Sequence, residues 1–177
     1  AERGIACADC HMPYRSEGGV KFTNHHMQSP LNDIASSCQV CHRESEETLR
    51  KNVYDRQNAV RQLGELAENS IVKAHIEAKT AWQNGATENQ MKEILQLIRH
   101  AQWRWDYVAA SHGGGFHAPV ESSRILGTAI QKAEEARVKL ATLLTRLGVS
   151  VPITMPDIST KAKAQQYIGL DMEKLRR

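Results

Sequence analysis

The sequence predicts a mainly α-helical fold with little or no β-structure, and three observations support this prediction. Apolar residues recur at intervals of three, four and seven along three long segments, which is the periodicity of an amphipathic helix. Capping and turn residues separate these segments from one another. No stretch of useful length shows the strict alternation of apolar and polar residues that a half-buried strand requires.

Ahead of the helices, the chain carries two copies of the pattern Cys-x-x-Cys-His, at Cys7–His11 and Cys38–His42. This pattern is the attachment site of a c-type haem, because two thiols at this spacing can each form a thioether with one porphyrin vinyl group. The histidine that follows can offer an imidazole nitrogen to the iron. The sequence therefore predicts two covalently attached haem c groups. The predicted thioether residues are Cys7, Cys10, Cys38 and Cys41, and the predicted iron ligands are His11 and His42.

Two other sites could use the same cysteines. A zinc ribbon would take all four thiolates, but the 27 residues between Cys10 and Cys38 exceed the usual ribbon gap. A ribbon also has no need of a histidine immediately after both pairs. Disulfides within the pairs would leave both histidines unexplained.

The first long helix is predicted over residues 44–84, a run without proline that ends at Asn84-Gly85. Its apolar positions are Leu49, Val53, Val60, Leu63, Ala67, Ile71, Ala74 and Ala78. At 1.5 Å per residue, about 40 residues make a helix about 60 Å long. This length exceeds what a compact domain of this size needs. We therefore expect the apolar stripe to pack in a helical hairpin, which is itself layered against a second copy of the chain.

A capping box at Thr87 and Gln90 opens the predicted second helix, which ends at His112-Gly113. Its apolar positions are Met91, Ile94, Leu95, Ile98, Ala101, Trp105 and Val108. The third helix is predicted from Pro119 to Gly148. Its apolar positions are Ile125, Leu126, Ala129, Ala133, Ala136, Leu140, Leu143, Leu144 and Leu147. Residues 159–176 are predicted to be helical again.

Composition agrees with a haem protein of ordinary domain size. The chain has 177 residues, which fits one domain. Aromatic residues make up only 5%. A haem protein can be poor in aromatic residues because the porphyrins themselves supply flat apolar surfaces. The net charge of +3 comes from basic residues scattered among acidic ones, so no nucleic-acid partner is predicted. Residues 1–43 are predicted to form a dihaem-binding segment. Residues 44–177 are predicted to form a long-helix region with a distal haem ligand and a dimer interface.

Several stretches resemble the C-terminal part of pentahaem cytochrome c nitrite reductase, and together they cover essentially the whole chain. They are Cys7–Pro13, Lys21–His25, His100–Asp106, Ser111–Pro119, and Pro156–Lys161 with Gly169-Leu170. The resemblance implies a largely helical, periplasmic enzyme that dimerises through long C-terminal helices. It also implies reduction of nitrite to ammonia with six electrons.

The resemblance assigns roles to four histidines. His11 would be the proximal ligand of the family's fourth haem, and His117 the distal ligand of that same haem. His42 would be the proximal ligand of the fifth haem. His25, rather than His26, would be the distal ligand of the second haem, whose attachment motif would lie upstream of this chain.

The family's catalytic haem is bound by a Cys-x-x-Cys-Lys motif, which this sequence does not contain. The residues that surround nitrite in the family, and its calcium site, would also lie upstream. The resemblance therefore implies that no catalytic residue lies in this segment, which would provide electron transfer and dimerisation. Haems with two histidine ligands suit this role because both axial positions are filled.

The expected function is thus that of part of an ammonia-forming nitrite reductase. Its expected partners are the upstream part of the same enzyme, a second copy, and a redox-partner cytochrome or quinol-oxidising electron donor. A periplasmic location is expected, since covalent haem attachment normally takes place outside the cytoplasm. The alternatives are a dihaem electron-transfer cytochrome, or part of a related multihaem enzyme that acts on hydroxylamine or another nitrogen oxide.

Overall fold

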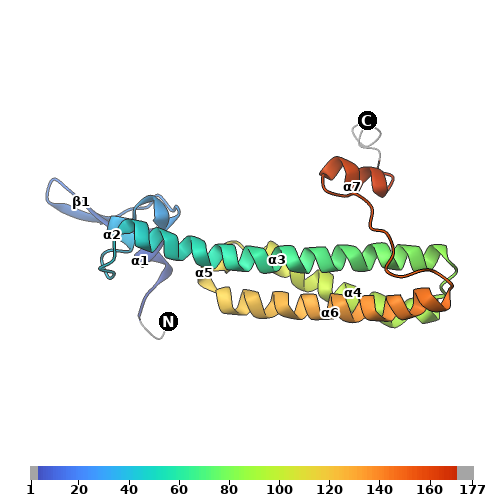
Figure 1. Ribbon diagram of the computed structural model, residues 1–177. Coiled ribbons are helices and arrows are strands. Elements are labelled where there is room, and N and C mark those ends of the chain that lie inside the picture. Colours follow the sequence, from blue (N-terminus) through green and yellow to red (C-terminus); the bar gives the residue numbers. More distant parts are fainter. Residues whose placement is uncertain (1–3, 171–177) are drawn as a thin grey trace. The chain divides into compact units, whose positions relative to one another are not determined.

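The computed structural model describes residues 4–170, and the chain divides into two compact units. The first unit comprises Ala1–Arg61 and Gly113–Pro119, and the second comprises Gln62–His112 and Val120–Arg177. Most of the described residues are helical, and their one sheet has two short strands (Figure 1). The predicted mainly α class is confirmed. The division predicted at residue 43 stays a prediction.

The core of the second unit lies among three helices, α3 (Glu46–Gln83), α4 (Glu88–Ala109) and α6 (Pro119–Arg146), which run alongside one another in Figure 1. Alanines of α3 face larger side chains of α4 and α6, so the helices can approach closely. The buried cluster consists of Ala74, Ala78, Ala81, Ala86, Met91, Ile94, Ile98, Ala136, Leu140, Leu143 and Leu144. Full burial of each leucine contributes about 1.5–3 kcal/mol.

The signals at the helix ends act as the sequence predicts. Thr87 Oγ1 accepts a hydrogen bond from the Gln90 backbone N–H at 3.4 Å, and Gln90 Oε1 accepts one from the Thr87 N–H at 2.8 Å. This reciprocal pair is a capping box, so that prediction is confirmed. Pro119 opens α6. Gly148, at φ +79°, follows the end of α6 in the left-handed conformation common after helices.

The apolar stripe of α3 is internal to the chain at Ile71. Ile71 is buried against Ala101 of α4 and Ala133 of α6, with Trp105 packed beside them. Trp105 Nε1 also donates a hydrogen bond to the Gly64 carbonyl at 3.1 Å. Ile71 is therefore unavailable to a second copy of the chain, and the hairpin alone explains this part of the stripe.

Two details of the helix predictions are wrong. Leu95 was expected on the buried face of α4, yet it is 42% exposed. The last helix, α7 (Lys161–Tyr167), is shorter than residues 159–176, because the chain turns at Gly169 with φ +71°. Residues 171–176 of that prediction lie outside the described residues. None of the helices in the described part of the chain has the length and hydropathy of a transmembrane span.

The second unit also contains an ion pair between helices. The Arg137 guanidinium of α6 forms two ion pairs. One is with Glu77 on α3 and the other with Glu134 on α6, each at 3.0 Å. Hydrogen bonds to Glu77 first, and then to Glu134, raise the pKa of Arg137 above its ordinary value despite partial burial. The pairing compensates the Glu77 carboxylate, which is 8% exposed.

The first unit is built from short elements around the first part of α3. They are α1 (Cys7–His11), β1 (Tyr14–Glu17), β2 (Val20–Thr23), a 3-10 helix η1 (Pro30–Asn32), α2 (Ile34–Ser37) and α5 (Gly114–His117). Strands β1 and β2 form an antiparallel hairpin in which Tyr14 pairs with Thr23. No strand was predicted at these residues, so the hairpin corrects that expectation, while it agrees with the predicted class of little or no β-structure.

Candidate haem-binding site

Both Cys-x-x-Cys-His motifs adopt tight helical turns in the first unit. The first motif is the whole of α1. The second begins at the C-cap of α2, where the backbone N–H groups of Cys41 and His42 donate to the Cys38 carbonyl at 3.1 and 2.9 Å. Residues at i, i+3 and i+4 of a helical turn share one face. Each motif therefore presents two thiols and an imidazole to the same side.

The two motifs lie close together because α1 packs against α2. Burial raises the pKa of the Cys10 thiol above its ordinary value, and the charges of Cys38, Asp9, Cys41 and Cys7 raise it further. All four cysteines are unpaired. Among residues 4–170, no three His, Cys, Asp or Glu side chains converge on a metal-sized site.

His11 and His117 come from opposite ends of the sequence, and the first unit brings them together. Their ring centroids are 6.0 Å apart, and their planes are at 85°. Two metal–imidazole bonds of about 2 Å each, with the half-width of a ring on either side, span about 6 Å. The separation fits a pair of imidazoles that hold one metal ion between them.

Each of two histidines has one ring nitrogen held by a backbone carbonyl. His11 Nδ1 lies 3.0 Å from the Gln28 carbonyl oxygen, and His25 Nδ1 lies 2.8 Å from the Thr23 carbonyl oxygen. Because a carbonyl only accepts, Nδ1 carries the proton in these hydrogen bonds and Nε2 keeps its lone pair. A metal-ligating histidine usually donates its other N–H in this way.

The neighbouring His26 differs from His25. For His26, the hydrogen bond that the structure shows is from its backbone N–H to Asn24 Oδ1 at 3.0 Å, rather than from its ring. The fixed ring of exposed His25 is therefore the better prepared ligand of the two. The assignment of His25 as a distal ligand stays a prediction.

His42 has a carboxylate beside it in place of a carbonyl. Its Nδ1 lies 3.6 Å from Glu44 Oε2. The pKa of the Glu44 carboxyl is lowered, first by a hydrogen bond from the backbone N–H of Glu44 and then by the charge of His42. Among the described residues, the ring contacts pair no second imidazole with His42.

The first unit buries few apolar side chains of its own. Among its described residues, the buried apolar ones are Pro13, Ile34, Leu49 and Val60. Others remain largely exposed around the motifs, namely Ile5, Met27, Val40, Tyr54 and Phe116. Large flat apolar groups bound at Cys-x-x-Cys-His turns would cover such side chains and complete a core. The residues present therefore fit haem.

The chain is similar to known proteins in both sequence and structure. The sequence profile of the cytochrome c552 family matches residues 1–177. The chain belongs to the cytochrome c552 family. Membership implies covalently bound haem c.

Its relatives are longer proteins. A cytochrome c-552 of Parabacteroides distasonis is 62% identical over 172 residues, which cover 97% of this chain and 35% of that protein. A cytochrome c-552 of Bacteroides fragilis is 61% identical over 177 residues, which cover 100% of this chain and 36% of that protein. The chain thus spans about a third of the length of these relatives.

A solved structure is also similar. It is the cytochrome c nitrite reductase of Desulfovibrio desulfuricans, with a TM-score of 0.72 and 30% sequence identity. The match covers 84% of this chain and 33% of that chain. The fold is thus that of a nitrite reductase-like cytochrome.

The sequence analysis missed the groups that orient the histidines. The carbonyl oxygens of Gln28 and Thr23 are backbone atoms, so the identity of these residues does not predict the hydrogen bonds. Glu44 could have been noticed, since a carboxylate two residues after the motif histidine can reach its ring.

Proposed function

We propose that this chain is the C-terminal part of a periplasmic, pentahaem, ammonia-forming nitrite reductase. In this proposal it carries two electron-transfer haems and the dimerisation helices, and the lysine-ligated catalytic haem belongs to the upstream part of the enzyme. The single observation that carries the proposal is the approach of His117 to His11, with ring centroids 6.0 Å apart.

Two haem c groups are proposed, one on Cys7 and Cys10 and one on Cys38 and Cys41. His11 and His117 would fill both axial positions of the first iron, which leaves no position for nitrite there. That haem would exchange electrons without binding substrate. When bound, haem supplies the one-electron chemistry, and the protein fixes the ligands and their orientation.

The surroundings of His25 and His42 support a chain that shares haem ligands with another part of the enzyme. His25 is exposed with Nδ1 held by Thr23, so its Nε2 can reach an iron outside these residues. His42 would take its second axial partner from the upstream part of the enzyme. The catalytic haem and its calcium are expected in that part as well.

Nitrite reduction to ammonium takes six electrons and eight protons and releases two waters. Each haem iron carries one electron at a time, so several haems together can store and relay these electrons. The contact between α1 and α2 supports a pair of attachment sites that lie close together. We propose that a redox-partner cytochrome or a quinol-oxidising protein supplies the electrons.

A homodimer is also part of the proposal, with its surface on α4 rather than on the internal stripe of α3. Leu95, Arg99, Trp103 and Tyr107 follow one another at four-residue steps along α4. Trp103 is 69% exposed and Tyr107 is 64% exposed. Aromatic and arginine side chains of this kind are enriched in protein interfaces.

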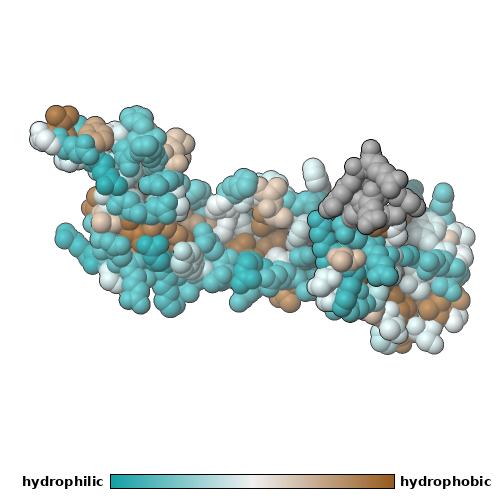
Figure 2. All heavy atoms as spheres, turned by 90° about the horizontal axis from the view of Figure 1, so that it is seen from above, coloured by the Kyte–Doolittle hydropathy of each residue, from teal (hydrophilic) through white to brown (hydrophobic). Residues whose placement is uncertain are grey.

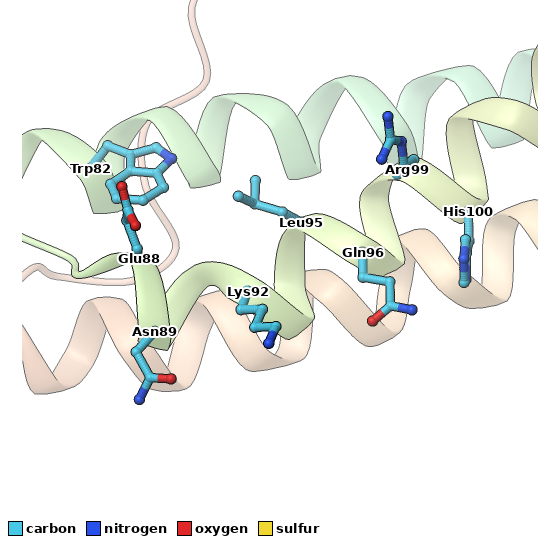
Figure 3. A pocket seen from close by; sticks show the side chains of 8 residues that line it. All are labelled: Trp82, Glu88, Asn89, Lys92, Leu95, Gln96, Arg99 and His100. Atoms are coloured by element: carbon cyan, nitrogen blue, oxygen red, sulfur yellow. The ribbon is translucent and has the colours of Figure 1, made fainter.

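A groove adjoins this stripe in the second unit. It has a volume of about 940 Å³ and lies between Trp82 at the end of α3 and α4 residues that include Leu95, Arg99 and His100 (Figure 3). Hydrophobic patches interrupt the largely hydrophilic face seen in Figure 2. A second copy that inserts apolar side chains here would cover Trp82 and Leu95.

The test is an assay of the full-length protein with nitrite and a reduced viologen as electron donor. The proposal predicts ammonium as the product, with six viologen electrons consumed for each nitrite. A protein that exchanges electrons but leaves nitrite unchanged would be a haem electron carrier. Reduction of hydroxylamine without reduction of nitrite would indicate the related multihaem class.

A further inference from the structure

Gly113 begins the turn that carries His117. It is the N-cap of α5 and has a backbone φ of +77°, which residues other than glycine rarely adopt. Its carbonyl accepts hydrogen bonds from the N–H groups of Phe116 at 2.9 Å and His117 at 2.8 Å. These two hydrogen bonds fix the backbone of the four-residue helix relative to Gly113.

The imidazole of His117 also rests against the bare Cα of Gly113. A Cβ atom placed on Gly113 would lie 3.2 Å from His117 Nδ1, 3.4 Å from Cε1 and 3.8 Å from Cγ. The first of these distances is shorter than ordinary van der Waals contact, so the ring would have to move. Gly148, with φ +79°, has nothing within 4 Å of its corresponding position.

We propose that Gly113 is a positioning residue for the haem ligand His117. The missing side chain leaves the space in which the imidazole of His117 lies. With 6.0 Å between the two ring centroids, there is room for one metal ion and little slack for a ring that has rotated. This inference rests on the proposed function, because it assumes that His117 ligates the iron held by His11.

The α5 turn has little freedom to compensate elsewhere. A Cβ on Gly115 would lie 3.1 Å from the Cα of Gln57, so α5 is packed closely on the first part of α3 within the same unit. A side chain on Gly113 is thus expected to displace the His117 ring rather than the helix. The distal bond to iron would lengthen or break.

The test compares Gly113→Ala with Gly148→Ala in the haem-loaded full-length protein. Both variants place alanine at a left-handed φ, but only Gly113→Ala adds a contact to His117. We expect Gly113→Ala to convert about one haem per chain from low to high spin in electron paramagnetic resonance. After reduction, the number of haems that bind carbon monoxide should rise by the same amount. Added imidazole should restore the low-spin signal. Gly148→Ala should match the wild type.

Gly113→Asn serves as the second variant, since asparagine tolerates the left-handed conformation yet carries a Cβ. It should show the same high-spin haem even if Gly113→Ala assembles poorly. Wild-type spectra for Gly113→Asn would overturn the inference. His117→Gly separates the two levels of the argument: if it yields a high-spin haem and the Gly113 variants do not, only the positioning role fails. If His117→Gly itself changes nothing, the ligand assignment fails.

Discussion

His11 and His117 make an edge contact in the first unit, with ring centroids 6.0 Å apart and ring planes at 85°. His11 belongs to the first Cys-x-x-Cys-His turn, and His117 to the short helix that follows α4. The Gln28 carbonyl holds Nδ1 of His11 at 3.0 Å, which leaves Nε2 available. In the proposed function, these two imidazoles would fill both axial positions of one electron-transfer haem.

His117→Gly removes the proposed distal ligand of that haem. We expect one low-spin haem signal to become high-spin in electron paramagnetic resonance, and the reduced haem to gain carbon monoxide binding. His100→Gly is the control, because His100 lies on α4 in the other unit. An unchanged spectrum in His117→Gly would reduce His117 to a turn residue.

His25→Ala should affect a haem that this chain does not itself attach. In the full-length protein we expect one haem to become high-spin while the haems on Cys7/Cys10 and Cys38/Cys41 keep their spectra. His26→Ala is the matched control, since the neighbouring ring lacks the Thr23 hydrogen bond. The assignment is contradicted if His26→Ala produces the change and His25→Ala does not.

Asp33 links α2 to strand β1 through two interactions. Its Oδ1 accepts from the Ser36 N–H at 3.3 Å and caps α2, and its Oδ2 pairs with Arg15. Asp33→Ala should lower the free energy of unfolding by about 1–2 kcal/mol, most of it from the lost cap. Asp33→Asn keeps a capping oxygen and should cost less than about 1 kcal/mol, as expected for a partly exposed ion pair.

Urea unfolding of the haem-loaded protein measures both variants. Because Cys38 follows α2 directly, the alanine variant should also retain less haem on the second motif. Equal losses for alanine and asparagine would show that the Arg15 pair, rather than the cap, provides the stability.

Trp103→Asp tests the proposed dimer surface on α4. Its side chain is 69% exposed, so the fold of a single chain should be unaffected. Loss of a central aromatic contact should weaken dimerisation by about 2 kcal/mol or more. Light scattering should then report monomers at concentrations where the wild type is dimeric. Val138→Asp, at a position of α6 that is 67% exposed, is the control. A dimer that tolerates Trp103→Asp would place the interface elsewhere.

The long helices could be predicted from sequence because their signals are local. Thr87 and Gln90 lie within one turn, and their reciprocal hydrogen bonds form as the capping-box pattern predicts. The hairpin was missed because its strands are exposed on almost every residue, which leaves no apolar alternation to detect. Its one signal was Gly18-Gly19, at φ +54° and +82°, a pair suited to a two-residue hairpin loop.

Long-range relationships were harder to predict. The apolar stripe of α3 was correctly identified, but periodicity alone does not say whether Ile71 packs on its own chain or on a second copy. The pairing of His11 with His117 likewise came from the resemblance, because spacing carries no information on residues so far apart. The carbonyls of Gln28 and Thr23 were beyond reach, since every residue has one.

Each Cys-x-x-Cys-His turn is proposed to hold one covalent haem. Mass spectrometry of the denatured full-length protein tests this, because thioether-bound haem stays attached when the protein unfolds. We predict that replacing Cys38 and Cys41 by serine removes the mass of one haem, and that replacing all four cysteines of this chain removes the mass of two. Variants that lose no haem mass, with one zinc ion bound in the native protein, would show that these turns do not hold haem.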